Sequence, residues 1–498
     1  MAKTRINNTM VEWKDIPWRK LERYVFRLQK RIFKASQQDN VKTVRRLQKT
    51  LLRSRSAKTL AVRQVTQDNQ GKNTAGVDGV KTLTPHQRLV LVSSLKISTK
   101  AKPTRRVWIA KTGTTEKRPL GIPTMDDRAL QALVKKALEP EWEACFEPNS
   151  YGFRPGRSAH DAIQSIFSSI CNKTRFVLDA DIAKCFDRIN HKVLLAKLNT
   201  FPILKRQIKW WLKAGVMDNE TLLPTQEGTP QGGVISPLLA NIALHGMERA
   251  LNQAFPAVQR SVNGVTTSRN KVHFIRYADD FVVLHEDLNV VLDCQAFITR
   301  WLDQVGLELK PSKTRITHTL HAFEGNVGFD FLGFTIRQFP VGKNRSGFDN
   351  KKQPLGFKTF IRPSVEGIKR HSNRLAQIVT RHKSSSQTVL IDDLNPVIRG
   401  WSNYYSAVVS GKQFARLTHL TFRKLWRWAK GRHPRKSAGW LKNRYWPRSR
   451  GNWRFALQEK GAALFQHSDT RIVRHVKVVS SRSPFDGDWV YWTGPPER

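Results

Sequence analysis

Acidic residues at two places in the chain have the type and spacing that nucleotidyl transfer requires. Asp279 and Asp280 stand side by side in HFIRYADDFVVLH, where the flanking apolar runs predict the two strands of a hairpin. Asp181 follows another apolar run upstream, in VLDADIAKCFDRI. Adjacent carboxylates in an apolar hairpin are unfavourable unless a cation compensates them. Three such groups predict a site that holds two Mg²⁺ ions against the attacking and leaving oxygens of a phosphoryl displacement.

Neighbouring residues suit the same chemistry, although each also has an ordinary structural interpretation. Asp181 alone would fit a helix N-cap, and its pairing with the YADD hairpin favours the metal role. Phe186 either packs in the core or lies beside the incoming sugar. The loop QEGTPQGG precedes an apolar helix, and its backbone and Gln231 are expected to line the pocket for template and nucleotide.

The charge of the chain indicates its partner. Lys and Arg total 86 against 39 Asp and Glu in 498 residues, a formal charge of +47. Such an excess repels itself in a compact fold unless a polyanion screens it. The cations are spread along a chain with 15 Trp, which favours a globular nucleic-acid-binding protein over histone-like packing or an anionic membrane surface. No apolar stretch approaches the ~18 residues of a spanning helix, so no membrane contact is expected.

Four cysteines lie far apart without CxxC spacing, so reduced thiols in a cytosolic compartment are expected rather than disulfides or a zinc site.

Periodicity predicts helical structure over residues 13–60, and the basic faces of these helices are either exposed to solvent or in contact with nucleic-acid phosphates. Further predictions are a hairpin over 104–123, a helix over 126–142, two strands around a turn over 319–336 and a linker over 341–356. From residue 351 to the end there are 30 Lys or Arg against eight Asp or Glu, with eight of the Trp, which suits phosphate contacts and base stacking.

Seven motifs occur in an order that resembles the reverse transcriptases encoded by group II introns. They are RPLGIP, YGFRPGRSAHDAI, DIAKCFDRI, GTPQGGVISPLLANIAL, YADDFVVL, LKPSKT and FLGF. The resemblance covers about residues 70–340. Downstream, the stretch around RGWSNYY (399–405) is similar to that family's maturase domain, which also forms the polymerase thumb.

The resemblance implies an α+β, right-hand polymerase: fingers and palm with an antiparallel sheet, an α-helical thumb and a basic DNA-binding region. The implied domains are an N-terminal helical extension (1–70), reverse transcriptase fingers and palm (71–345), the thumb or maturase domain (346–445) and a basic C-terminal DNA-binding region (446–498). Because no cysteine follows Cys294, we expect no HNH endonuclease. A nascent strand at a replication fork is our hypothesis for the primer.

The resemblance also implies roles for individual residues. Asp181 and Asp279 would be the principal Mg²⁺ ligands, with Asp280 completing the acidic triad and the Ile182 carbonyl as a further ligand. The implied nucleotide-binding residues are Lys111, Arg118, Phe186, Gln231 and Lys313. Of these, Phe186 would disfavour a 2′-hydroxyl, and Lys313 would be the acid for the leaving pyrophosphate. The implied contacts to primer and nucleic acid are Phe331, Leu332, Gly333, Arg423, Lys424 and Arg427.

By resemblance the protein binds its group II intron RNA as a ribonucleoprotein, assists splicing and copies the intron from dNTPs into target DNA during retrohoming. The expected location is the bacterial cytoplasm, on the nucleoid. One alternative is a maturase that only assists splicing, against which the three intact acids count. Another is a related reverse transcriptase in CRISPR spacer acquisition or phage defence, against which the full thumb and basic tail count. The presence of Phe186 argues against a third alternative, a viral RNA-dependent RNA polymerase. The sequence gives no basis for predicting the oligomeric state.

Overall fold

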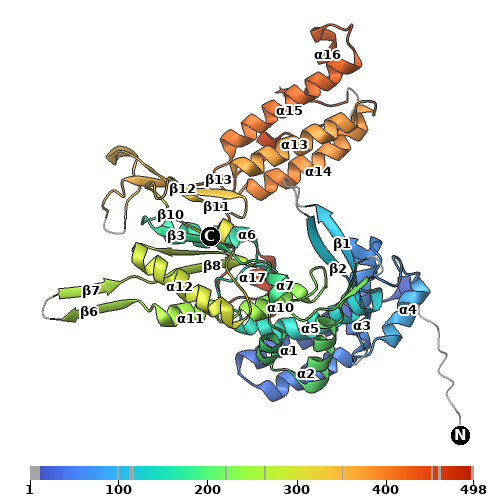
Figure 1. Ribbon diagram of the computed structural model, residues 1–498. Coiled ribbons are helices and arrows are strands. Elements are labelled where there is room, and N and C mark those ends of the chain that lie inside the picture. The colour runs from blue at the N-terminus through green and yellow to red at the C-terminus, as the bar shows by residue number, and fades with distance from the viewer. Residues whose placement is uncertain are drawn as a thin grey trace. The chain divides into compact units, whose positions relative to one another are not determined.

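The computed structural model of the protein describes residues 12–97, 100–110, 117–218, 221–262, 265–349, 352–449, 452–457 and 461–494. The chain folds into two compact units (Figure 1). The first combines Met1–Ala162, Ala180–Arg315 and Val478–Arg498, and the second combines Ile163–Asp179 and Ile316–Lys477. Each unit is therefore built from segments that are far apart in the sequence.

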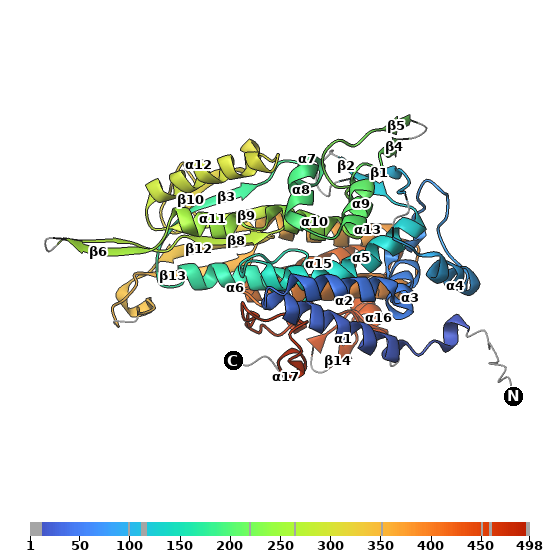
Figure 2. The same ribbon diagram turned by 90° about the horizontal axis from the view of Figure 1, so that it is seen from below.

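Three basic helices begin the first unit: α1 (Trp18–Gln37), α2 (Val41–Arg53) and α3 (Arg55–Arg63). The apolar repeat predicted for α1 is confirmed, because Val25, Leu28 and Ile32 are buried and α1 packs against α5 (Met125–Cys145) (Figure 2). Two caps divide the predicted helical stretch. The side chains of Asn40 and Ser54 accept backbone N–H groups in the first turns of α2 and α3, and such caps set where helices begin.

Antiparallel strand pairs form much of the rest of this unit. The hairpin predicted over 104–123 is confirmed as β1 (Thr104–Ala110) and β2 (Lys117–Ile122), and β4 (Val216–Asp218) runs parallel beside β1 with β5 (Thr221–Leu223) at the edge. The YADD hairpin is β8 (His273–Tyr277) and β9 (Asp280–His285). A further hairpin, β6 (Val258–Val262) and β7 (Val265–Arg269), extends away from the helices of the unit in both views (Figures 1 and 2).

The remaining helices of the unit surround these strands. They are α4 (Pro85–Ser94), α7 (Cys185–Arg188), α8 (His191–Leu198), α9 (Pro202–Leu212), α10 (Ser236–Leu244), α11 (Met247–Ala254), α12 (Leu288–Gln304) and α17 (Trp489–Thr493). Helix α10 is the apolar helix predicted after the QEGTPQGG loop, and it is buried over almost all of its length. Helix α6 (Ala159–Ile170) and strand β3 (Phe176–Asp181) each contain a point at which the chain passes from one unit to the other.

The second unit combines a small sheet with a helix bundle. The antiparallel strands are β11 (Phe329–Phe331), β12 (Phe334–Pro340) and β13 (Phe357–Pro363), so the strands predicted within 319–336 fall slightly later in the chain. The helices are α13 (Val365–Arg381), α14 (Gln387–Tyr405), α15 (Gly411–Arg432) and α16 (Ala438–Tyr445). The first three lie side by side (Figure 1), around a core that includes Leu394, Ile398 and Leu425.

The described residues of the predicted linker, 341–349 and 352–356, instead extend the β12–β13 pair as a hairpin arm. The Val341 N–H donates to the Gly356 carbonyl, and the Leu355 N–H donates to the Gly347 carbonyl, both at 2.9 Å. The linker prediction was wrong because a solvent-exposed hairpin needs the same Gly, Lys and Asn composition as a connecting loop.

The region predicted as one C-terminal domain is divided between the two units after Lys477. Residues 478–493 return to the first unit, where the Val478 N–H donates to Asp161 Oδ1 at 2.9 Å. Arg157 Nη2 donates to the carbonyls of Ser480 and Arg482, both at 2.8 Å. This segment, which we call the returning segment, is thus held to the first turn of α6 and to the loop before it. Within the described residues, no helix is long and apolar enough to cross a membrane.

A buried pair of histidines in the second unit is expected to make its stability depend on pH. His371 Nε2 and His467 Nε2 lie 2.8 Å apart, and burial lowers the pKa of His371 to about 3 and that of His467 to about 4. Both folded pKa values lie below the ordinary 6.5, so the stabilisation is present above pH 6.5 and is lost as the pH falls through that value. From pH 7 to pH 5 the loss should be roughly 2 kcal/mol for each histidine.

Thermal unfolding between pH 7.5 and pH 5 measures this effect. His371→Gln should flatten the fall of Tm with acidity, whereas His419→Gln, at an exposed position on α15, should leave it unchanged. An equal slope in the His371 variant and the parent would show that the pair does not control acid stability.

Candidate active site

The YADD hairpin presents its acids on a tight, strained turn. Tyr277 pairs with Asp280, so Ala278 and Asp279 form a two-residue loop. Ala278 has φ +59°, in the left-handed region that costs a non-glycine residue about 1–2 kcal/mol. Gly152 permits this conformation, because a Cβ there would lie 2.3 Å from the Ala278 backbone nitrogen. The backbone around the acids is therefore shaped by a second segment of the chain.

The third predicted acid lies beside this turn. Asp181 ends β3 and is buried, and the N–H of the next residue, Ile182, donates to the Asp279 carbonyl at 3.3 Å. Lys313 Nζ donates to Asp181 Oδ2 at 2.6 Å, and the Lys310 N–H donates to the Asp181 carbonyl at 2.8 Å. The structure thus brings together acids that the sequence separates.

Electrostatics confirm that these groups interact. Burial raises the pKa of Asp279, the negative charge of Asp181 raises it further, and the cations Lys313 and Arg118 oppose both effects. Burial alone would lower the pKa of Lys313, but its hydrogen bond to Asp181 and the charges of the other two acids raise it above the ordinary value. Burial and the charge of Asp181 thus both disfavour the ionised form of Asp279, and a bound divalent cation would offset both effects.

Arg276 supports the YADD hairpin through hydrogen bonds, and the sequence did not predict this role. Its side chain is fully buried, and Nη1 donates to Asn241 Oδ1 at 3.2 Å and to the Ala278 carbonyl at 3.0 Å. Nη2 donates to Ser150 Oγ at 2.7 Å, and Asn241 Nδ2 donates to the Gly152 carbonyl at 2.8 Å. This network joins the turn to the loop that carries Gly152. An arginine inside the apolar run HFIRY was the available signal, because a buried cation needs several partners.

Two of the predicted nucleotide-binding residues, Phe186 and Gln231, belong to segments of the first unit that are hydrogen-bonded to the QEGTPQGG loop or lie within it. The Thr229 N–H donates to the Phe186 carbonyl, and the Gly121 N–H donates to the Gln231 carbonyl at 2.7 Å. These bonds tie the QEGTPQGG loop to both α7 and β2. Gln231 lines a cavity of about 260 Å³ together with Arg106 and Asp187. The predicted residue Lys111 lies outside the described residues.

Phe186 is half-buried, and its ring meets the exposed Phe153 edge-on with centroids 6.2 Å apart. Arg118 is exposed on β2. Both residues are accessible to a ligand, whereas Cys185 beside Phe186 is buried, and burial together with Asp279 raises the pKa of its thiol far above the ordinary value.

Comparison with known proteins identifies the chain. The N-terminal domain of reverse transcriptase matches residues 13–95, the reverse transcriptase (RNA-dependent DNA polymerase) family matches 109–336, and the group II intron maturase-specific domain matches 368–446. "Protein YkfC" of Escherichia coli K12 is 32% identical over 305 residues, which cover 55% of this chain and 78% of that protein. The chain belongs to the group II intron reverse transcriptase family.

Other relatives of this reverse transcriptase carry names that agree with this family assignment. "Group II intron-encoded protein LtrA" of Lactococcus lactis subsp. cremoris is 28% identical over 423 residues, 71% of this chain and 69% of that protein. "Maturase-like protein 1" of Euglena gracilis is 28% identical over 408 residues, 79% and 77% of the two chains. The reverse transcriptase is thus an RNA-directed DNA polymerase that carries a maturase domain, as the motifs predict.

The remaining predicted site residues of the reverse transcriptase lie in its second unit. Leu332 and Gly333, with φ +50° and +81°, form the turn between β11 and β12. The hydroxyls of Tyr404 and Tyr405, from RGWSNYY, donate to the carbonyls of these two residues at 2.9 and 3.0 Å. Phe331 is buried beside the turn. The FLGF and RGWSNYY motifs therefore form one structure.

The basic residues of α15 that were predicted to contact nucleic acid differ in their exposure to solvent. Arg423 and Arg427 are exposed, whereas Lys424 donates to Ser372 Oγ at 3.1 Å, and burial with its two cationic neighbours lowers its pKa. Across the part of the chain that the structure describes, no three His, Cys, Asp or Glu side chains converge as a preformed metal site. In the active site, Lys313 lies against Asp181 instead.

Proposed function

We propose that this reverse transcriptase binds its group II intron RNA, assists splicing and copies the intron into target DNA during retrohoming. The observation that carries the catalytic part is the electrostatic coupling of Asp181, Asp279 and Asp280 with Lys313. The proposed architecture is a right hand, with fingers and palm in the first unit and a thumb formed by the helices α13–α15. We place the protein in the bacterial cytoplasm, on the nucleoid.

The site residues fit a pair of Mg²⁺ ions, because burial and the neighbouring charge of Asp181 disfavour the ionised form of Asp279 and bound cations would compensate both carboxylates. In our proposal Asp181 and Asp279 hold the ions, with Asp280 and the Ile182 carbonyl as further ligands. When bound, the ions activate the primer 3′-oxygen and stabilise charge on the leaving group. The new bond joins that oxygen to the α-phosphorus of a dNTP, while the bond from the α-phosphorus to the bridging oxygen breaks and pyrophosphate leaves.

Cationic side chains of the chain support this displacement. Lys313 is protonated at neutral pH, since the ordinary pKa of lysine is already far above 7 and the hydrogen bond to Asp181 raises it further. Lys313 therefore holds a proton that pyrophosphate can take as it leaves. Arg118 extends positive charge toward the same acids. In the proposal, Arg118 contacts the triphosphate, Gln231 contacts the template and nucleotide, and the FLGF turn contacts the primer. Arg423, Lys424 and Arg427 contact nucleic-acid phosphates.

Phe186→Val tests the proposed choice of DNA over RNA. The ring would stand beside the sugar, so its loss should raise the ratio of UTP to TTP incorporation roughly 10- to 100-fold. The measurement is kcat/KM for the two nucleotides on poly(rA)/oligo(dT). Phe153→Val is the comparison, since Phe153 packs on the outer edge of the Phe186 ring. A ratio that changes equally in both variants would assign Phe186 to packing alone.

The proposed function is tested by primer extension with the purified chain. With poly(rA)/oligo(dT), TTP and Mg²⁺, we expect DNA synthesis that stops when EDTA removes the metal and resumes when Mg²⁺ is restored. Splicing of a precursor that contains the cognate intron, at near-physiological Mg²⁺, tests the maturase part. A folded, RNA-binding chain that supports splicing but extends no primer would exclude the polymerase mechanism.

A further inference from the structure

The turn of the FLGF motif has a backbone conformation that its own sequence does not favour. Phe331 pairs with Phe334, so Leu332 and Gly333 form a two-residue hairpin loop, with φ +50° and +81°. Two-residue loops with positive φ at both positions usually begin with Asn, Asp or Gly, because a larger side chain is strained there. Leucine at the first position therefore indicates that contacts from elsewhere in the chain hold this turn.

Two consecutive tyrosines at the end of α14 make such contacts. The Tyr404 hydroxyl donates to the Leu332 carbonyl at 2.9 Å, and the Tyr405 hydroxyl donates to the Gly333 carbonyl at 3.0 Å. Both rings also pack on the buried Phe334, with centroids 5.1 and 5.0 Å from the centroid of its ring. Each residue of the loop therefore accepts a hydrogen bond from a different tyrosine.

The Tyr405 hydroxyl lies in a close-fitting slot between the turn and the start of α13. A Cβ atom at Gly333, or at Gly367 in the first turn of α13, would lie 3.0 Å from the hydroxyl oxygen. The Ser364 N–H donates to the same Gly333 carbonyl at 2.9 Å, and the Ser364 hydroxyl caps α13 by accepting the Gly367 N–H at 3.1 Å. Two glycines and a helix cap thus fix where this hydroxyl meets the turn.

We propose that Tyr404 and Tyr405 position the FLGF turn against the primer strand, so that a part of the maturase-specific segment is needed for DNA synthesis. The inference rests on the proposed function, in which this turn contacts the primer. Both tyrosines lie within residues 368–446, which match the maturase-specific domain, whereas the turn lies within residues 109–336, which match the reverse transcriptase family. The two hydroxyls therefore join the two matched segments at the residues that would meet the primer.

Binding of labelled poly(rA)/oligo(dT) to the full-length chain, measured by fluorescence anisotropy without nucleotide, tests the proposal. Tyr404→Phe and Tyr405→Phe each remove one hydroxyl and keep the ring, so each should raise the dissociation constant by roughly three- to tenfold. The KM for TTP in primer extension should change by less than about twofold, because Phe186 and Gln231 belong to the first unit. A smaller fraction of folded enzyme would lower the apparent kcat without separating these two constants.

Tyr445→Phe is the matched control. The Tyr445 hydroxyl and His433 Nε2 lie 2.8 Å apart, so this variant also loses one tyrosine hydrogen bond within the second unit. Tyr445 lies on α16, at the end of the helix bundle away from β11–β13 (Figure 1), and its loss should leave primer–template binding unchanged. Gly367→Ala keeps both tyrosines but places a methyl group against the Tyr405 oxygen, and it should weaken binding as Tyr405→Phe does.

A double-mutant cycle with Leu332 tests whether the hydroxyls act through the strained turn. Asn adopts positive φ more readily than leucine, so the turn of Leu332→Asn should depend less on the Tyr404 hydroxyl. Tyr404→Phe should therefore raise the dissociation constant by a smaller factor, about twofold, in the Leu332→Asn background. An equal factor in both backgrounds would overturn the proposal.

Crosslinking separates failure of this inference from failure of the proposed function. Oligo(dT) with 4-thiothymidine near its 3′ end is annealed to poly(rA) and irradiated with the chain without dNTP, and crosslinked peptides are mapped by mass spectrometry. We expect a crosslink within residues 327–337, with a yield roughly threefold lower in either tyrosine variant at subsaturating primer. No crosslink there in the parent would overturn the proposed primer contact, and with it this inference. A parent crosslink whose yield neither variant changes would overturn this inference alone.

Discussion

Asp279→Asn is expected to abolish primer extension while leaving the fold as stable as before, or more stable. Loss of the negative charge on a metal ligand removes several kcal/mol of transition-state stabilisation, so the rate of primer extension should fall by roughly 1000-fold or more. Burial and Asp181 raise the pKa of Asp279, which means that the folded protein disfavours its charge. The neutral amide has the same shape and removes that repulsion. Initial rates on poly(rA)/oligo(dT) and the Tm of the same preparation measure both effects.

Opposite changes in activity and stability separate a functional acid from a structural one. Asp293→Asn, at an exposed position on α12, should change neither quantity and serves as the control. If Asp279→Asn lowered the Tm by several degrees, Asp279 would be structural, and the loss of activity would carry no information about metal binding.

Arg276→Leu should have the largest effect on stability among the residues near the site. The substitution leaves Asn241 Oδ1, the Ala278 carbonyl and Ser150 Oγ without a donor in a dry interior. It also removes positive charge that interacts with Glu147 and Glu248. We expect a loss of about 3–5 kcal/mol in the free energy of unfolding of the first unit. Denaturant unfolding followed by tryptophan fluorescence measures it.

Burial lowers the pKa of Arg276, and Glu147 and Glu248 oppose that effect only in part, so we expect most of the stabilisation to come from the hydrogen bonds. Arg276→Lys keeps the charge but loses the forked geometry, and it should recover only a small part of the loss. Arg300→Leu, exposed on α12, is the control for removing one cation from a basic protein. Full recovery by lysine would show that charge, and not geometry, holds the hairpin.

Local patterns predict the elements of this protein and the identity of its candidate acids. The apolar runs around YADD predict β8 and β9, and the apolar repeat of α1 predicts which face of that helix is buried, because both depend only on neighbouring residues. Asp181, Asp279 and Lys313 lie together as the motif order predicts. The metal and nucleotide roles of these residues remain predictions.

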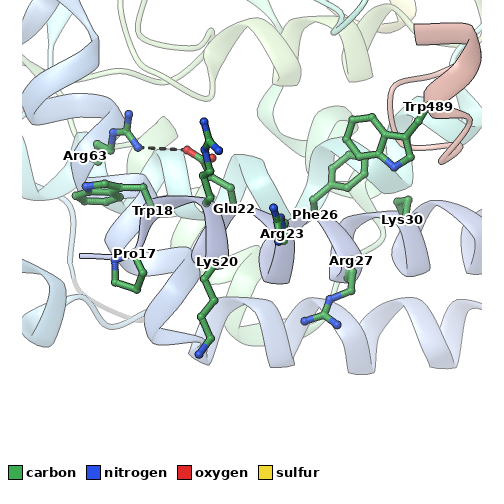
Figure 3. Close-up of a pocket in the computed structure, with 11 residues that line it drawn as sticks. Pro17, Trp18, Lys20, Glu22, Arg23, Phe26, Arg27, Lys30, Arg63 and Trp489 are labelled. Atoms are coloured by element: carbon green, nitrogen blue, oxygen red, sulfur yellow. Dashed lines mark hydrogen bonds and ion pairs between the residues drawn. The ribbon is translucent and has the colours of Figure 1, made fainter. Parts of the chain in front are cut away.

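Features that depend on distant segments could not be predicted in the same way. Gly152 and Arg276 both contact Ala278, and the sequence around neither residue indicates that Ala278 is its partner. The hairpin arm at 341–356 was taken for a linker because composition alone does not distinguish paired from unpaired polar chain. The division of the C-terminal region after Lys477 follows from contacts with α1 (Figure 3), with α6 and with the loop before α6, which no periodicity reveals.

The returning segment also constrains the order of events during synthesis of the protein. Asp161 and Val478 are 317 positions apart, so the ribosome must translate the whole second unit, together with residues 180–315 of the first, before their hydrogen bond can form. At 5–20 residues per second this interval is roughly 15–60 s. During that time Phe26 lacks its cover of Phe485 and Trp489. A ribosome that pauses within the second unit therefore carries a first unit that still lacks its last piece.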